Sequence, residues 1–259
     1  MAYSSHRLGG SRMLLLMRFV CLVLRRLGLA ALLPLLASGC GFNAKTQNAA
    51  GVRMYQQGFY AGAQQRFQQA VYNDPANGDS YYNLAATLHK IGRVNQSQSE
   101  LDQAESYYNQ CLDHSPNHGD CYRGLAVLLS EQGRSEEAFR LVQGWSMRSP
   151  SLPDPKIELA RLHQEYGDKE SAKNSLLEAL TVDPNNARAL AALGKIHEET
   201  GNMAQALSDY QRSLMANNQQ PEVAARVAVL QPAFGNRLLA PPTVTGTRTV
   251  QNQNQPIFK

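Results

Sequence analysis

Apolar residues recur along the central part of the chain with two periods. On the short scale they lie three or four positions apart, as in Tyr81, Leu84, Ala85 and Leu88, and this spacing places them on one face of an α-helix. On the long scale, glycines recur at separations of 34, 41, 34 and 34 residues: Gly58, Gly92, Gly133, Gly167 and Gly201. A repeat near 34 residues with helical spacing inside it predicts an all-α array of helix pairs.

Three other residue series share the long period and suggest a role for each position. They are the prolines Pro75, Pro116, Pro150 and Pro184, the alanines Ala63, Ala104, Ala138, Ala172 and Ala206, and the large residues Phe67, Tyr108, Val142, Leu176 and Tyr210. A proline ends the second helix of a pair because it cannot continue one. Small residues, including Gly51 and Gly194, allow two helices to cross closely, and the large residues fill the space between neighbouring pairs.

These series divide the chain into predicted units. Five helix pairs are expected, followed by a capping helix, at residues 44–77, 78–118, 119–152, 153–186, 187–220 and 221–230. In the second pair, which is seven residues longer, we expect Gly92 to end the first helix. The extra polar residues, 95–101, should lengthen the second helix by about two turns that project from the array. Residues 231–259 are rich in Pro, Thr, Gln and Asn, which predicts a disordered tail. A short recognition segment is the alternative for that tail.

On these residues the chain resembles the tetratricopeptide repeat family over 177 of its 259 residues. The resemblance implies a right-handed superhelical solenoid of about five helix pairs plus a C-terminal capping helix. It also implies a concave groove that binds a protein or peptide and is lined by the first helix of each pair. The residues that the resemblance assigns to this groove are Asn48, Val52, Tyr55, Tyr82, Asn83, His89, Arg123, Val127, Arg161, Gln164 and Lys195.

The N-terminal segment has the pattern of a targeting sequence. Arg25 and Arg26 precede an apolar run over residues 27–37 that is too short to span a bilayer as a helix. The following stretch, Leu36 to Cys40, resembles a bacterial lipobox, which implies that residues 1–39 are a signal peptide and that Cys40 carries lipid. The implied location is the bacterial envelope, with a membrane anchor facing the periplasm, and Gly41 favours the outer membrane. An ordinary secretory signal or an uncleaved anchor are the alternatives, and Met1, Met13 and Met17 are candidate starts.

The charge distribution excludes a nucleic-acid-binding protein. The formal charge is +4, but residues 1–40 hold five arginines and no acidic residue, and removing these five leaves 20 basic against 21 acidic residues. The clustered basic face that nucleic acid needs is therefore not predicted. The sequence also has no phosphate loop or nucleotide fingerprint. We therefore expect a protein that is not an enzyme and that takes no cofactor and no small-molecule substrate.

One group of residues has the side chains of a metal or disulfide site. Cys111, His114, His118 and Cys121 lie within eleven residues of one another. Packed free thiols, a disulfide between the two cysteines and a metal site are three alternatives. The spacing differs from the close cysteine pairs of familiar zinc sites, so we predict no metal. A disulfide needs the two Cα atoms within about 7 Å.

Two functions are consistent with these patterns. The first is a non-catalytic scaffold anchored in the envelope, in the assembly of a pilus or secretion machine, because the leader and repeats resemble those of pilus-assembly lipoproteins. The second is an accessory subunit that regulates an envelope enzyme acting on peptidoglycan or polysaccharide.

Overall fold

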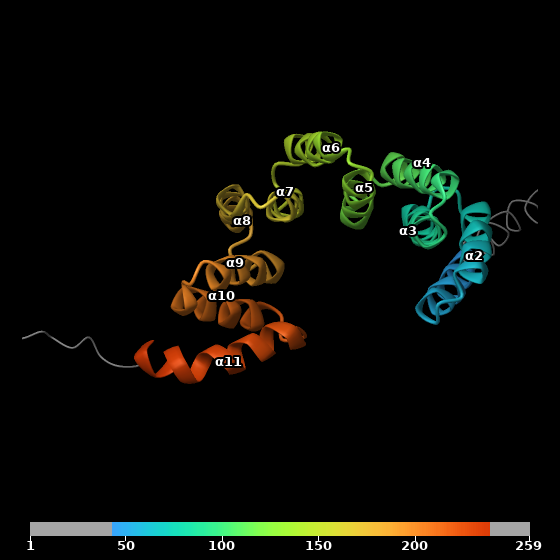
Figure 1. Cartoon of the computed structure of the whole chain (residues 1–259). Coiled ribbons are helices and arrows are strands. Elements are labelled where there is room, and N and C mark those ends of the chain that lie inside the picture. Colours follow the sequence, from blue (N-terminus) through green and yellow to red (C-terminus); the bar gives the residue numbers. More distant parts are fainter. Residues whose placement is uncertain (1–42, 239–259) are drawn as a thin grey trace, which may run out of the picture. The chain divides into compact units, whose positions relative to one another are not determined.

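A computed structural model describes residues 43–238 (Figure 1). The predictions for residues 1–39, for Cys40 and for residues 239–259 lie outside the described residues. The described part is all-α and consists of helices that follow one another as pairs. Its helices are residues 43–56, α2 (Tyr60–Asn73), α3 (Gly78–Asn95), α4 (Gln98–His114), α5 (Gly119–Glu131), α6 (Ser135–Arg148), α7 (Asp154–Glu165), α8 (Lys169–Val182), α9 (Ala187–Glu199), α10 (Met203–Ala216) and α11 (Pro221–Leu238).

The chain divides into two compact units, and the boundary between them falls inside α6, after Val142. We refer to them as unit 1 and unit 2. In both, consecutive helices form the pairs that the 34-residue period predicts, and a single helix follows the last pair. This confirms the predicted fold class, an all-α array of about five helix pairs with a further helix at its end.

Local side-chain bonds and glycine turns set the helix ends. Several first helices begin with a side chain that accepts a hydrogen bond from the backbone three residues later, as in Asn77 to Ser80 and Asn186 to Ala189, both at 3.1 Å. Four of the first helices end near a glycine in the left-handed region, which favours glycine because it has no Cβ. These glycines and their φ angles are Gly58 (82°), Gly133 (77°), Gly167 (80°) and Gly201 (81°).

The longer second pair differs from its prediction. Gly92 does not end the first helix, since α3 continues to Asn95 and the left-handed residue is Gln96, with φ of 52°. Gly92 is buried inside α3, where a Cβ atom would lie 2.9 Å from the Leu101 side chain in α4. The extra residues therefore lengthen both helices, which reach 18 and 17 residues, and the added turns pack against each other.

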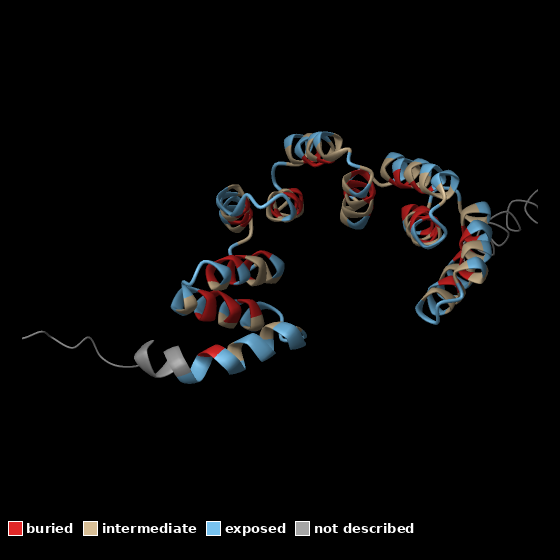
Figure 2. Cartoon of the chain, in the orientation of Figure 1, coloured by how far each residue is buried: buried red, intermediate tan, exposed pale blue. Residues whose placement is uncertain are grey.

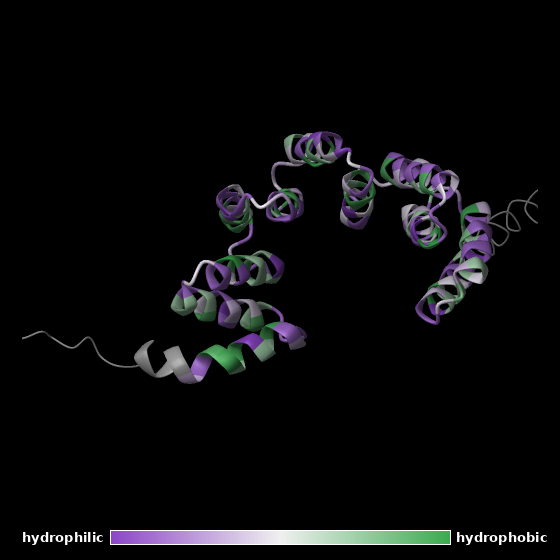
Figure 3. Cartoon of the chain, in the orientation of Figure 1, coloured by the Kyte–Doolittle hydropathy of each residue, from purple (hydrophilic) through white to green (hydrophobic). Residues whose placement is uncertain are grey.

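Small residues face aromatic rings where the two helices of a pair cross. A Cβ atom on Gly51 would lie 2.6 Å from the Phe67 ring in unit 1, and one on Gly194 would lie 2.8 Å from the Tyr210 ring in unit 2. Figure 2 shows the buried residues gathered on the sides of helices that face their neighbours. Figure 3 shows hydrophobic residues on many of these sides, and α11 also carries hydrophobic residues where it is exposed. Burial of apolar surface between consecutive helices is thus the main source of stability.

The helix after the last pair is longer than the predicted capping helix. It spans Pro221–Leu238 and continues through Pro232, so residues 231–238 do not belong to a disordered tail. Val223, Val227 and Leu230 lie four and three positions apart on one face and pack against Ala206, Leu207 and Tyr210. The helix therefore closes the apolar face of the fifth pair, as a cap requires. Among the described residues, no helix combines the length and the apolar character needed to cross a membrane.

Candidate protein-binding site

An aromatic cluster lies at the centre of the predicted groove residues of unit 1. The ring of Tyr82, in α3, lies 6.3 Å from the ring of Tyr108 in α4 and 5.4 Å from that of His118, measured between centroids. Tyr108 is buried, whereas Tyr82 is half-buried. Tyr82 therefore packs against the core and keeps part of its side chain accessible.

Two asparagines connect the first helices of the first two pairs. The Asn83 Nδ2 group in α3 donates to Asn48 Oδ1 in the helix over residues 43–56, at 3.0 Å. Each side-chain amide has two donor hydrogens and an acceptor oxygen, so a single bond between them uses only part of their capacity. Both side chains are half-buried. This pair can therefore also bond to the backbone of an extended peptide.

The tyrosines of this region keep their protons. Burial is the main cause that raises the pKa of Tyr55, and Tyr60 raises it further. The pKa of Tyr82 is also raised, first by burial and then by the negative charge of Asp120. Burial raises the pKa of Tyr108 far above its ordinary range. Near neutral pH these groups are therefore uncharged hydroxyls that can donate or accept a hydrogen bond.

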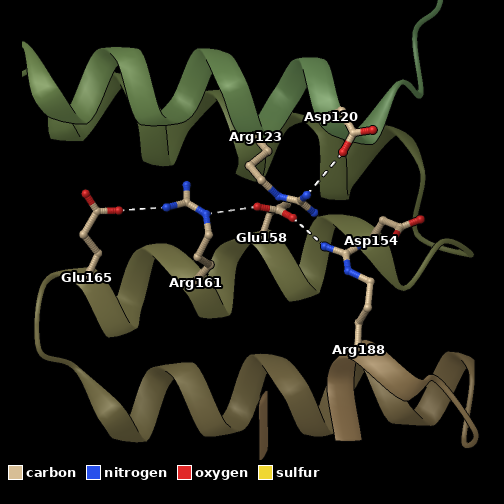
Figure 4. Close-up of polar contacts among 7 residues, drawn as sticks. All are labelled: Asp120, Arg123, Asp154, Glu158, Arg161, Glu165 and Arg188. Carbon is tan, nitrogen blue, oxygen red and sulfur yellow. Dashed lines mark hydrogen bonds and ion pairs between the residues drawn. The ribbon is translucent and has the colours of Figure 1, made fainter. Parts of the chain in front are cut away.

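Not every predicted groove residue of unit 1 lies at the surface. His89 is only 7% exposed, and its Nε2 atom lies 2.9 Å from a carboxylate oxygen of Glu131 in α5, so it packs inside rather than lining a groove. Arg123 bonds to Asp120 one turn earlier, at 3.2 Å (Figure 4). Val127 is half-buried and Val52 is exposed. The sequence predicts which face of a helix these residues share, but not how deeply each one lies.

In unit 2, the predicted groove residue Arg161 belongs to a network of ion pairs. Its Nε and Nη1 atoms lie 3.1 and 2.8 Å from carboxylate oxygens of Glu158 and Glu165, on the same helix, α7 (Figure 4). Glu158 is 1% exposed and also binds Arg188 of α9, which reaches Asp154, both at 2.8 Å. A buried carboxylate needs such partners. This network therefore has a structural role in joining α7 to α9.

Lys195, the last predicted groove residue, lies at the rim of a pocket of about 740 Å³ between α9, α10 and α11. Ala192, Met203 and Val223 give the pocket apolar walls. Across its rim, Glu198 accepts a hydrogen bond from the Tyr210 hydroxyl group at 3.0 Å and pairs with Arg226 of α11. The sequence does not predict this pocket, because its shape depends on how side chains of α9, α10 and α11 meet in the fold.

Comparisons with known proteins identify the repeats. Three models of the tetratricopeptide repeat match residues 42–116, 96–151 and 157–221, and together they span most of the chain. The chain is a tetratricopeptide repeat protein. Such repeats are typically non-catalytic scaffolds for protein–protein interaction, and the concave faces of their arrays bind protein or peptide partners.

Solved structures show the same fold at low sequence identity. A thermophilic tetratricopeptide repeat protein of Thermus thermophilus is 21% identical, with a TM-score of 0.54 over 73% of this chain and 99% of that one. PilF of Pseudomonas aeruginosa is 17% identical, with a TM-score of 0.51 over 77% of this chain and 87% of that one. No curated protein sequence matches the chain significantly. At these identities the likeness concerns the fold.

A disulfide joins two tetratricopeptide repeats at the point where the longer second pair ends. It links Cys111 in the last turn of α4 to Cys121 in the first turn of α5, with Cα atoms 6.5 Å apart. Both cysteines are fully buried. Of the three alternatives for these residues, the structure thus contains the disulfide. The link lies beside His118, whose ring contacts Tyr82.

Proposed function

We propose that this tetratricopeptide repeat protein binds an extended peptide segment of a protein partner on the face of unit 1 around Tyr82. The observation that supports it most is the pairing of a supported aromatic residue with the Asn48–Asn83 amide pair on neighbouring first helices. Tyrosine anchors contribute strongly to binding at interfaces, because they bury a large area and still form a hydrogen bond. The amides supply donors and acceptors for a peptide backbone.

The N-terminal segment indicates where in the cell this protein would act. We propose that Cys40 is lipidated and anchors the chain to an envelope membrane, facing the periplasm, with the outer membrane favoured. The lipobox pattern supports this. Cys40 lies three positions before Asn43, where the first described helix begins. An anchor there would hold the first repeat, and with it the face around Tyr82, close to the membrane. In this setting the scaffold would act in assembly of a pilus or secretion machine, and the fold likeness to PilF is consistent with that role.

A crosslinking experiment tests the binding face. The protein is crosslinked in intact cells and recovered from the membrane fraction, and the partners are identified by mass spectrometry. Tyr82→Ala should reduce recovery of the direct partner by roughly tenfold or more, the loss expected for an interface anchor. Tyr72→Ala is the matched control, because Tyr72 lies in the same unit and is 85% exposed. Equal recovery with both variants, at unchanged thermal stability, would show that the face around Tyr82 does not bind the partner.

The identity of the recovered proteins decides between the two functions. Pilus or secretion-pore subunits would support the assembly role, whereas enzymes of peptidoglycan or polysaccharide metabolism would support the accessory-subunit alternative. The same membrane fraction tests the anchor. A lipid-modified peptide beginning at Cys40 supports it, and an unmodified peptide that spans Gly39 and Cys40 as the dominant species contradicts it.

A further inference from the structure

We propose that Cys111, His118 and Cys121 form a zinc site when their disulfide is reduced. One ligand atom from each of the three residues lies within 4.8 Å of the other two. Two cysteine sulfurs and an imidazole nitrogen are a ligand set typical of Zn²⁺. The sequence spacing did not favour a metal. The structure adds the folded position of His118 and its contact with Asp79.

The local backbone places the His118 ring and the Cys121 sulfur near one position, where a metal ion could bind both. His118 is the N-cap of α5, and its Nδ1 atom accepts a hydrogen bond from the Cys121 backbone N–H at 3.3 Å. The same N–H also bonds to the His118 carbonyl oxygen at 3.1 Å. Nδ1 can therefore turn to a metal ion while the Cys121 amide keeps a partner. Cys111 approaches this point from the last turn of α4.

The other ring nitrogen of His118 has the partner that metal-bound histidines usually have. Its Nε2 atom lies 3.0 Å from a carboxylate oxygen of Asp79, at the start of α3. A carboxylate that accepts the N–H on the far side of the ring fixes the tautomer, leaves the other nitrogen as a ligand and raises its basicity. This contact involves a third helix and is independent of the positions of the two cysteines.

The surroundings fit a zinc–thiolate centre. In a tetrahedral site with Zn–S bonds of about 2.3 Å, two ligand atoms lie roughly 3.5–3.8 Å apart, and the three ligand atoms here lie within 4.8 Å of one another. The two sulfurs are bonded to each other in this structure, so reduction must first free them to move apart to that spacing. Tyr81, Val71 and Leu112 pack around the cysteines and form an apolar shell, which strengthens the attraction between thiolate and metal. The His118 side chain is 14% exposed, so we expect a water molecule that enters along it to be the fourth ligand.

A dithiol can act as the reductant that converts the disulfide form into the zinc-binding form. The dithiol transfers two electrons and two protons to the Cys111–Cys121 bond and becomes a disulfide itself, which leaves two cysteine thiols. Zn²⁺ then binds their sulfurs and releases the two protons. In both states α4 remains tied to α5, so the junction between the second and third repeats beside Tyr82 would be held under oxidising and reducing conditions alike.

Cobalt binding tests the site directly, because Co²⁺ takes the same ligands and gives absorption bands from cysteine thiolates. The purified protein is reduced with a dithiol, freed of it by gel filtration under argon, and titrated with Co²⁺ and then with Zn²⁺. We expect one metal ion per chain and thiolate bands that Zn²⁺ removes. The oxidised protein is the internal control, because it has the same histidines, carboxylates and other cysteines but no thiolate at Cys111 or Cys121.

Variants separate the ligands from their neighbours. Cys111→Ser and Cys121→Ser should abolish the thiolate spectrum of a two-cysteine site, and His118→Ala should weaken Zn²⁺ binding by roughly 10-fold or more. Asp79→Asn should weaken it by about 10-fold, the usual effect of such an outer partner. His114→Ala is the matched control and should bind normally, because His114 is a neighbouring histidine that stacks on Tyr81 instead.

Two outcomes would overturn the proposal. The first is a reduced protein that takes up no more Co²⁺ than the oxidised protein, and the second is a His118→Ala variant that binds Zn²⁺ as tightly as His114→Ala. Circular dichroism shows whether the reduced, metal-free protein keeps its helices. If reduction unfolds the metal-free protein, recovery of helix on adding Zn²⁺ supports the site, and no recovery counts against it.

Discussion

At the scale of single residues, close helix crossings depend on glycine facing an aromatic ring. Gly51 and Gly194 occupy equivalent places in the first and fifth repeats, and each faces a ring, that of Phe67 or Tyr210, on the second helix of its pair. A Cβ atom within 3 Å of ring carbons forces the ring or the backbone to move, and protein interiors resist such a change because they are close-packed.

Gly194→Ala should therefore destabilise unit 2. The added Cβ would lie 2.8 Å from the Tyr210 ring, and we expect a loss of about 1–3 kcal/mol in the free energy of unfolding. Gly62→Ala is the control, because Gly62 is also helical and its nearest neighbour is the flexible end of Met54, at 3.1 Å. That change should be neutral or should stabilise by up to about 1 kcal/mol. Urea unfolding measures both, and equal effects would refute the role assigned to the ring contact.

The repeat period predicts the glycines at helix crossings well, because each position can be compared with the equivalent position in the other repeats. Gly51 and Gly194 are predicted as close crossings from the period alone, and both lie at such crossings. The period predicts His89 less well, since the burial of this residue depends on Glu131, which lies 42 residues away. The period also places Cys111 and Cys121 at one junction between repeats. It cannot show that His118 turns toward them, because that depends on Asp79 in another helix.

At the scale of elements, the second repeat shows where prediction from glycines fails. Four first helices end at a glycine in the left-handed conformation, whereas α3 ends at Gln96 in that conformation. A residue with a Cβ rarely adopts these angles and loses about 1–2 kcal/mol by doing so. The sequence contains no signal for a helix end at Gln96, and the prediction that Gly92 ends this helix is wrong.

Two substitutions distinguish the observed turn from the predicted one. Gln96→Gly should stabilise the protein by about 1 kcal/mol, because glycine adopts the left-handed conformation without strain. Gly92→Ala should destabilise it by about 1–3 kcal/mol, because its Cβ would meet Leu101. Thermal unfolding followed by circular dichroism measures both changes. If Gly92 were the turn, Gln96→Gly would instead lie inside a helix and would destabilise the protein.

At the scale of the whole molecule, stability should be local. Within the described residues, the extensive helix contacts that are resolved join helices consecutive in sequence, and alternate helices, such as α3 with α5 and α7 with α9, contact each other less. In such an array the free energy is close to a sum of repeat terms and nearest-neighbour terms. The period and the helical spacing are enough to predict this organisation. They cannot predict the full length of α11, because the residues after Leu230 lack the apolar spacing that identifies a helix.

The cap offers a direct test of this locality. Leu230→Ala should weaken the contact of α11 with the fifth pair by about 2 kcal/mol, because Leu230 is buried against Leu207 and Tyr210. Amide hydrogen exchange in α10 and α11 should then become roughly 30-fold faster, while exchange in α7, two repeats from the cap, should change much less. Val229→Ala is the matched control, since Val229 is the residue next to Leu230 and is 64% exposed, and it should leave exchange in α10 unchanged. Equal acceleration in α7 and α10 on Leu230→Ala would mean that unit 2 unfolds as one cooperative block rather than repeat by repeat.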